Sequence, residues 1–299
     1  MTENDSKFVL ELPGVERVQL HGLPAVRVSN ESASGLVYLQ GAHLAAWQPT
    51  GHGPVIWVSE NAVYGAGKAL RGGVPICFPW FGPHAEHKEL PAHGFARTRA
   101  FEYRGARLDS SGRTELEFVL DSDEQTLSVF PYAFTARLRV ALGQSLRLAF
   151  SVSNRDLQPF AFEEALHSYF AVGDVTRASL RGLEGARYVD KVREQSLFTE
   201  GQRELRFVAE TDRVYESTAT CTIDDPAGTR KIVIEKQNSA ATVVWNPWRE
   251  RAAQMSDLGA SAWPGMLCVE SANVGKSRVT LSPGESHELE VAVSVSGIS

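Results

Sequence analysis

The chain has few cysteines and no long hydrophobic run, and both absences narrow its class. Its 299 residues include only three cysteines, Cys77, Cys221 and Cys268, with no C-x-x-C pair. Such a scattered, odd set predicts reduced thiols and argues against a disulfide framework or a cysteine zinc site. No apolar stretch reaches the roughly 20 residues that span a bilayer, and the polar first seven residues lack the core of a secretory signal. We therefore expect a cytoplasmic protein that does not associate with membranes.

Positive charge is also scarce. Lysine and arginine total 30 against 36 acidic residues, which gives a formal net charge of −6. Binding to a phosphate backbone needs an excess of basic residues, so nucleic acid is excluded as a main partner. A small anionic ligand would have to be met by a local group of arginines. With 43% hydrophobic and 22% charged residues, the chain can bury the core of a globular protein.

A two-residue alternation of apolar and polar side chains dominates the sequence. It runs through residues 134–142 and, after Gly143 and Gln144, through residues 146–152, which predicts an antiparallel hairpin with a tight turn. It returns at residues 289–295 near the C-terminus. Shorter strand candidates are residues 35–39, 55–58, 115–120, 218–223, 232–235 and 241–245.

Helical patterns are rare by comparison. Only residues 247–258 have one, with Asn246 as the N-cap, Pro247 in the first turn and Gly259 after the end. Many short strands with almost no helix predict an all-β sandwich or barrel. No segment has the composition of a linker. We therefore expect one domain over residues 1–299, with residues 1–34 as N-terminal strands or an extension.

An irregular segment, residues 65–97, is the first candidate for function. It is rich in glycine, proline and aromatic residues, and a long irregular segment inside a β fold is usually functional. Arg71 precedes two glycines, but the lysine and Ser/Thr of a P-loop are missing, so nucleotide binding is not predicted. His93 and Arg97 share a short loop and could converge on one anion. The alternative is an ordinary loop with a solvated arginine.

Three further residues are candidates for proton transfer or sugar contacts. His167 follows an apolar, acidic stretch, and without a further motif the sequence favours a structural histidine hydrogen-bonded to Glu163 or Glu164 over a catalytic one. Glu270 follows the apolar residues 266–269, where a carboxylate is costly unless it is paired or used. Asp212 suits contacts with sugar hydroxyls or a turn. No histidine pair or cysteine cluster predicts a metal, and no G-x-S-x-G motif predicts a serine hydrolase.

Together these segments resemble the aldose 1-epimerase (mutarotase) superfamily over about residues 35–295. Within it the chain is similar to the glucose-6-phosphate 1-epimerases, also called hexose-6-phosphate mutarotases. The resemblance is carried by GAHLAAW (41–47), RGGVPICFPWFG (71–82), HGFAR (93–97), EALHSYF (164–170), ETDRVY (210–215), VWNPW (244–248) and VESAN (269–273). No single segment is specific, but all of them in this order are. One departure is Ala92 before His93, where the resemblance implies a polar side chain, often glutamine, on a sugar hydroxyl.

The resemblance implies a fold, a reaction and a site. The fold would be a large antiparallel β-sandwich with few short helices, the galactose mutarotase-like supersandwich, with its cleft on the concave sheet. His167 would be the general acid and Glu270 the general base, without metal or organic cofactor. The residues placed in the substrate cleft are Arg71, His93, Arg97 and Asp212. The ligand would be a hexose 6-phosphate, glucose 6-phosphate first. Independently of the resemblance, we expect a monomer.

The implied reaction opens the hemiacetal ring, rotates the C1 aldehyde and closes the ring from the other face. Glu270 as carboxylate and His167 as imidazolium suit the two proton transfers, each worth about 10²–10⁴-fold. Glu163 or Glu164 would raise the pKa of His167 if they face it. Arg71 and Arg97 would hold the phosphate through paired hydrogen bonds.

Three other functions are compatible with the sequence. One is a catalytically silent carbohydrate-binding or sugar-sensing protein on the same fold, which fold alone never excludes. Another is a mutarotase of an unphosphorylated aldose. A glycosidase fits less well, because it typically needs two carboxylates and the proposed partner of Glu270 is a histidine.

Overall fold

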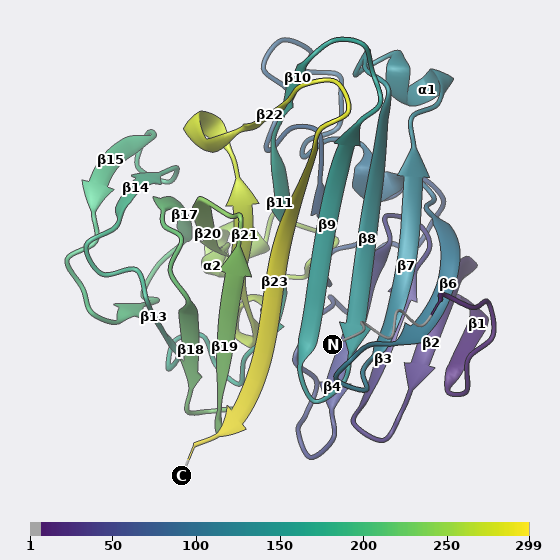
Figure 1. Cartoon of the computed structure of the whole chain (residues 1–299). Helices are drawn as coiled ribbons and strands as arrows, with labels where there is room; N and C mark the ends of the chain where they lie inside the picture. Colours follow the sequence, from purple (N-terminus) through teal and green to yellow (C-terminus); the bar gives the residue numbers. More distant parts are fainter. Residues whose placement is uncertain (1–6, 299) are drawn as a thin grey trace.

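Antiparallel strands dominate the computed structural model, which describes residues 7–298. Residues 1–6, which hold most of the polar N-terminal segment, and residue 299 lie outside the described part. Within residues 7–298, no helix is long and apolar enough to cross a membrane. Two large sheets carry most of the strands, and two smaller sheets complete the fold (Figure 1).

The larger sheet has nine strands in the order β16-β13-β18-β19-β23-β9-β8-β7-β6. Its strands are β6 (Glu102–Leu108), β7 (Thr114–Asp121), β8 (Phe134–Leu142), β9 (Leu146–Asn154), β13 (Ser179–Arg181), β16 (Leu205–Arg206), β18 (Cys221–Asp225), β19 (Arg230–Gln237) and β23 (Ser286–Gly297). The C-terminal strand β23 lies between β19 and β9, so the end of the chain joins its two halves (Figure 1).

The second sheet has eight strands in the order β15-β14-β17-β20-β21-β11-β5, and β12 also pairs with β21. Its strands are β5 (Ile76–Cys77), β11 (Glu164–Leu166), β12 (Tyr169–Ala171), β14 (Arg187–Asp190), β15 (Ser196–Thr199), β17 (Thr211–Glu216), β20 (Ala241–Asn246) and β21 (Met266–Asn273). All of its strand pairs are antiparallel.

The remaining elements are small. The N-terminal sheet has four strands in chain order, β1 (Val15–Leu20), β2 (Leu23–Ser29), β3 (Ala33–Tyr38) and β4 (His43–Pro49). A two-stranded sheet joins β10 (Phe160–Phe162) to β22 (Val279–Leu281). The described helices are α1 (Glu124–Leu127), α2 (Trp248–Ala252) and three 3₁₀ turns at Ala96–Thr98, Trp263–Gly265 and Gly275–Ser277.

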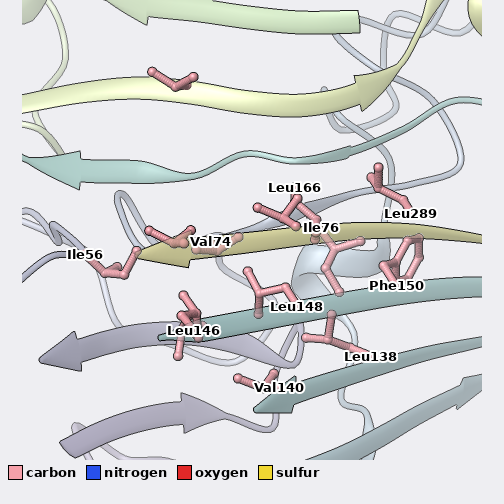
Figure 2. Close-up of a cluster of buried hydrophobic side chains, with 14 of the residues drawn as sticks. Ile56, Val74, Ile76, Leu138, Val140, Leu146, Leu148, Phe150, Leu166 and Leu289 are labelled. Atoms are coloured by element: carbon pink, nitrogen blue, oxygen red, sulfur yellow. The ribbon is translucent and has the colours of Figure 1, made fainter. Parts of the chain in front are cut away.

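The core lies between the two large sheets. Alternate side chains of the hairpin β8–β9, such as Leu138 and Phe150, point away from solvent because successive residues of a strand face opposite sides. They meet Ile76 of β5 and Leu166 of β11 from the other sheet (Figure 2). Truncating Phe150, which is fully buried, to alanine would cost about 3–5 kcal/mol of stability. The core thus packs against one face of the eight-stranded sheet, and the opposite face of that sheet carries the site.

Several predicted elements are confirmed. The hairpin forms as β8 and β9, joined by residues 143–145, and the C-terminal alternation forms β23. The candidates at residues 35–39, 115–120, 232–235 and 241–245 correspond to β3, β7, β19 and β20. The all-β class and the antiparallel sandwich are therefore correct.

Three predicted elements are wrong in part. Residues 55–58 make only isolated bridges at Ile56 and Val58, and the strand expected at 218–223 begins only at Cys221. The helix expected at 247–258 is only five residues long, although the Asn246 side chain accepts from Trp248 N at 2.9 Å at its start, as expected of a capping residue. The chain turns back after α2 so that Trp263 packs on Trp248, with ring centroids 4.3 Å apart. This tertiary contact overrides the local helical pattern.

Candidate active site

One pocket of about 430 Å³ gathers most of the predicted site residues. Its walls are Arg71, Phe81, Gly82, Pro83, His93, His167, Lys191, Gln195, Asp212, Val243, Trp245, Arg251 and Glu270. The two predicted catalytic residues and three of the four predicted substrate contacts are among them. Only Arg97 is not. A volume of this size is typical of small-molecule sites.

Strand register explains why distant residues meet here. Asp212 of β17 pairs with Trp245 of β20, and Val243 of β20 pairs with Glu270 of β21. Side chains two residues apart on a strand share a face, so these four side chains lie on one face of the eight-stranded sheet. The intervening Val244 points the other way and belongs to the core. A run of alternating positions on β17, β20 and β21, neighbours in Figure 1, therefore builds the floor of the pocket.

His167 lies in the two-residue connection between β11 and β12. Its backbone N–H donates to Pro75 O at 3.0 Å, and its ring stacks on Tyr169 with centroids 4.8 Å apart. Its Nε2 is 3.3 Å from Oε1 of Glu270. The two residues are 8% and 1% exposed, so the pair is nearly closed off from bulk water. A histidine and a carboxylate in contact inside a sugar-sized pocket are suited to paired proton transfer.

Burial controls the charge state of this pair. Burial lowers the pKa of His167 well below its usual value, and the nearby His93, Arg97 and Arg71 lower it further. Burial also raises the pKa of Glu270 well above its usual value. In the free pocket these shifts favour a neutral imidazole beside a protonated carboxyl. The expected imidazolium–carboxylate starting pair is the other arrangement of the same single proton.

The neighbouring acids do not supply the charge expected for His167. Glu163 accepts hydrogen bonds from Phe81 N and Gly275 N at 2.8 and 2.6 Å. The fully buried Glu164 contacts Asn273 and His287 instead, each at 2.8 Å. Neither carboxylate is therefore engaged with His167, so the condition under which one of them would raise its pKa is not met. Alternation along β11 puts Glu164 on the same face of the sheet as the core residue Leu166, which is the face away from the pocket.

Arg71 enters the pocket with both ends of its guanidinium already engaged. Nε and Nη2 lie 3.1 and 3.0 Å from Asp257 Oδ2, and Nη1 donates to the Tyr169 hydroxyl at 3.1 Å. The glycines that follow serve close packing: a Cβ on Gly73 would lie 2.0 Å from His43 Nε2, and this glycine has a φ of +69°. The glycines after Arg71 thus let the backbone of this segment pack closely against its neighbours, which fixes the position of Arg71.

His93 is a neutral wall of the pocket. Its Nδ1 accepts from Gly82 N at 3.3 Å, which leaves the proton on Nε2. Burial first, and Arg97 second, lower its pKa to about 3. Its ring centroid lies 5.7 Å from that of His167. The next residue, Gly94, is required because a Cβ there would lie 1.9 Å from Phe78 O.

Arg97 stands behind the pocket. It belongs to the 3₁₀ turn Ala96–Thr98, and its Nη2 donates to Ala92 O at 2.7 Å. Its positive charge nevertheless lowers the pKa of both His93 and His167. Position 92 thus contributes its backbone carbonyl to this loop, whatever its side chain.

Three polar pocket residues escaped the sequence reading: Lys191, Gln195 and Arg251. They come from the loop after β14 and from α2, and no local motif marks them. Lys191 Nζ lies 3.3 Å from Asp212 Oδ1. Only the pairing of β14 with β17, which sets residue 191 opposite Asp212, could have indicated it.

One set of metal-ligand types occurs in the described residues. Ligand atoms of His167, Cys268 and Glu270 all lie within 4.8 Å of one another and are buried. Metal-free catalysis was expected because the sequence has no local cluster of metal ligands, and His167 lies far in sequence from Cys268 and Glu270. Burial raises the pKa of the Cys268 thiol well above its usual value, so the sulfur is a poor ligand in its resting form. The absence of a resident metal stays a prediction.

Comparison with known proteins shows which family the chain is similar to. A family model described as aldose 1-epimerase matches residues 24–294. A "putative glucose-6-phosphate 1-epimerase" of Salmonella typhimurium is 36% identical over 262 residues, which cover 87% of this chain and 86% of the relative. A protein of the same name from Cenchrus ciliaris is 33% identical over 290 residues, 94% of this chain and 85% of the relative.

Solved structures agree on the fold. The crystal structure of a "putative mutarotase" from Salmonella typhimurium superposes with a TM-score of 0.89 at 32% identity, covering 97% of each chain. A galactose mutarotase-like protein from Lactobacillus casei has a TM-score of 0.72 at 17% identity, over 91% of this chain and all of that one. The supersandwich predicted from the sequence is therefore confirmed.

Proposed function

The chain belongs to the aldose 1-epimerase family, and from this we propose that it interconverts the α and β anomers of a hexose 6-phosphate, with glucose 6-phosphate as the first substrate. As a member of this family it is an isomerase that acts on a sugar. The observation that carries the proposal is the 3.3 Å contact between His167 Nε2 and Glu270 Oε1 inside a pocket that also holds Arg71. The names of the relatives from Salmonella and Cenchrus support the phosphorylated substrate.

The proposed chemistry uses only the two side chains. Glu270 takes the proton of the anomeric hydroxyl as His167 gives one to the ring oxygen, and the ring opens. The C1 aldehyde then rotates. Neutral His167 then takes back the proton of the hydroxyl that was the ring oxygen, while protonated Glu270 gives its proton to the C1 carbonyl oxygen. The ring closes on the other face of C1. The pocket without substrate favours neutral His167 and protonated Glu270, which is the pair that closes the ring. One proton must therefore pass from Glu270 to His167 before a closed ring can be opened.

Recognition of the phosphate is proposed to rest mainly on Arg71. It lines the pocket and carries a planar guanidinium that can form paired hydrogen bonds with phosphate oxygens. Asp257 shares that charge, so Arg71 is oriented but partly neutralised. Arg97 contributes positive charge from behind the wall. We propose that Asp212 and His93 contact sugar hydroxyls, as pocket residues with acceptor and donor atoms.

We also propose that the protein works as a single-domain, cytoplasmic monomer without metal or organic cofactor and without nucleic acid or membrane as a partner. One buried cluster that extends from Val26 to Val293 supports the single domain. The net charge of −6 supports the exclusion of nucleic acid.

The test is the rate of α/β equilibration of glucose 6-phosphate and of glucose, measured side by side by exchange NMR with purified protein. We expect acceleration of both, with the larger kcat/KM for the phosphorylated sugar. Equal values would leave a general aldose mutarotase. Saturable binding of glucose 6-phosphate without acceleration would instead identify a silent sugar-binding protein.

A further inference from the structure

Lys191 is built into the pocket by the sheet itself. It follows β14 directly, and its backbone N–H donates to Asp212 O at 2.8 Å, which continues the β14–β17 pairing by one residue. Its Nζ lies 3.3 Å from Asp212 Oδ1 and 4.8 Å from the centre of the Phe81 ring. The side chains of Lys191 and Asp212 are both 28% exposed, so the ion pair is held in the pocket wall. The backbone, a carboxylate and an aromatic face together fix this ammonium.

Lys191 is also an electrostatic partner of Glu270. The charged and titratable groups around the Glu270 carboxyl are His167, Tyr169, Cys77, Cys268, Asp212, Arg97 and Lys191. Burial is the largest influence and raises the pKa of Glu270, and Lys191 opposes it more than Arg97 does. Asp212 acts in the same direction as burial, and Lys191 neutralises Asp212 as well. One ammonium thus acts on both acids of the pocket.

On the basis of the proposed function, we propose that Lys191 is a positioning residue for the anomerisation, holding the Asp212 carboxylate in place and supplying positive charge beside Glu270. Without this ammonium, two carboxyl groups would share a buried pocket with one counter-charge fewer. Like charges in one site make the second carboxyl harder to ionise. Arg97 cannot replace Lys191 at Asp212, because its guanidinium lies outside the pocket and donates to Ala92 O.

The experiment is the pH profile of kcat/KM for Lys191→Met, Lys191→Gln and Lys191→Arg. His167 and Glu270 interact closely, so the two groups titrate together and the observed pKa values belong to the pair. Removing a nearby positive charge raises the proton affinity of the whole pair. For a unit charge inside the pocket, at an effective dielectric constant near 20, both limbs of the profile should move to higher pH by about one unit. On the acid limb this is a loss of about tenfold at a given pH.

The matched control is Arg193→Met. Arg193 stands in the same loop, lies over the Phe198 ring and does not line the pocket, so the variant loses the same charge elsewhere. Its profile should coincide with that of the parent, and Lys191→Arg should return most of the shift. Thermal melts of all variants check that they are folded.

Two results overturn the inference in distinguishable ways. If the parent equilibrates the sugars and both neutral Lys191 variants keep the parent's pH limbs, the role of Lys191 is refuted while the proposed function stands. If the parent accelerates neither glucose 6-phosphate nor glucose, the proposed function and this inference fall together.

Discussion

Replacing Arg71 tests how the pocket selects an anionic sugar. In Arg71→Met the aliphatic bulk remains while the guanidinium is lost. A hydrogen bond with a charged partner is worth about 1.5–3 kcal/mol. Because Asp257 already shares this guanidinium at 3.0 Å, we take the lower half of that range. At about 1.4 kcal/mol per factor of ten, kcat/KM for glucose 6-phosphate should fall by roughly ten- to fortyfold.

The comparison with glucose isolates the phosphate contact. Glucose makes no such contact, so its kcat/KM should change little. The substitution also removes the 3.1 Å hydrogen bond from Arg71 to the buried Tyr169 hydroxyl, and Tyr169→Phe controls for that loss. Arg249→Met, at an exposed position of α2 outside the pocket, controls for net charge. Equal losses on both sugars in Arg71→Met would show that Arg71 only braces the wall.

Asp257→Asn should change kcat/KM for glucose 6-phosphate in the opposite direction to Arg71→Met. Removing this carboxylate frees the Arg71 guanidinium for the phosphate, so kcat/KM for glucose 6-phosphate should be kept or raised, with glucose unchanged. A loss confined to glucose 6-phosphate would instead mean that Asp257 is needed to hold Arg71 in place.

Three further outcomes follow from the charges around the pair. The raised pKa of Glu270 means that the native state holds a proton which the unfolded chain releases above pH 4.5, so the contribution of Glu270 to stability falls as pH rises. The melting temperature of Glu270→Gln relative to the parent should therefore increase from pH 5 to pH 8. A constant difference between the two melting temperatures would contradict the raised pKa. Arg97→Met should lower kcat/KM for glucose 6-phosphate by less than Arg71→Met does, because Arg97 acts from behind the wall. Activity should survive exhaustive chelation, and full loss restored by one divalent ion would show that His167, Cys268 and Glu270 hold a required metal.

The sequence predicted most of the fold because its strands alternate cleanly. The hairpin β8–β9 and the strand β23 have one apolar face each, and burial of that face sets their register. Residues 55–58 were wrongly predicted as a strand because they are apolar and wholly or partly buried without being paired in a ladder. The helix after Asn246 was overestimated because a contact between Trp248 and Trp263, distant in sequence, turns the chain.

The site was predictable only where a residue stands in a recognisable segment. His167 and Glu270 were found through their flanking residues, and the β11–β21 pairing brings them together. Their charge states were not predictable, because burial and the cations around the pocket are properties of the folded molecule. Lys191 was missed for a similar reason: its role depends on the strand beside it, and nothing in its own neighbourhood in sequence marks it.

The most direct measurement of the central claim is the exchange rate between the anomers of glucose 6-phosphate in the parent, His167→Gln and Glu270→Gln. Both variants keep side-chain volume, so their melts should show folded protein. Loss of one positioned acid or base costs about 10²–10⁴-fold, so each variant should fall at least a hundredfold below the parent. A folded variant that keeps half of the parent rate would contradict the assignment of the pair as the proton-transfer groups.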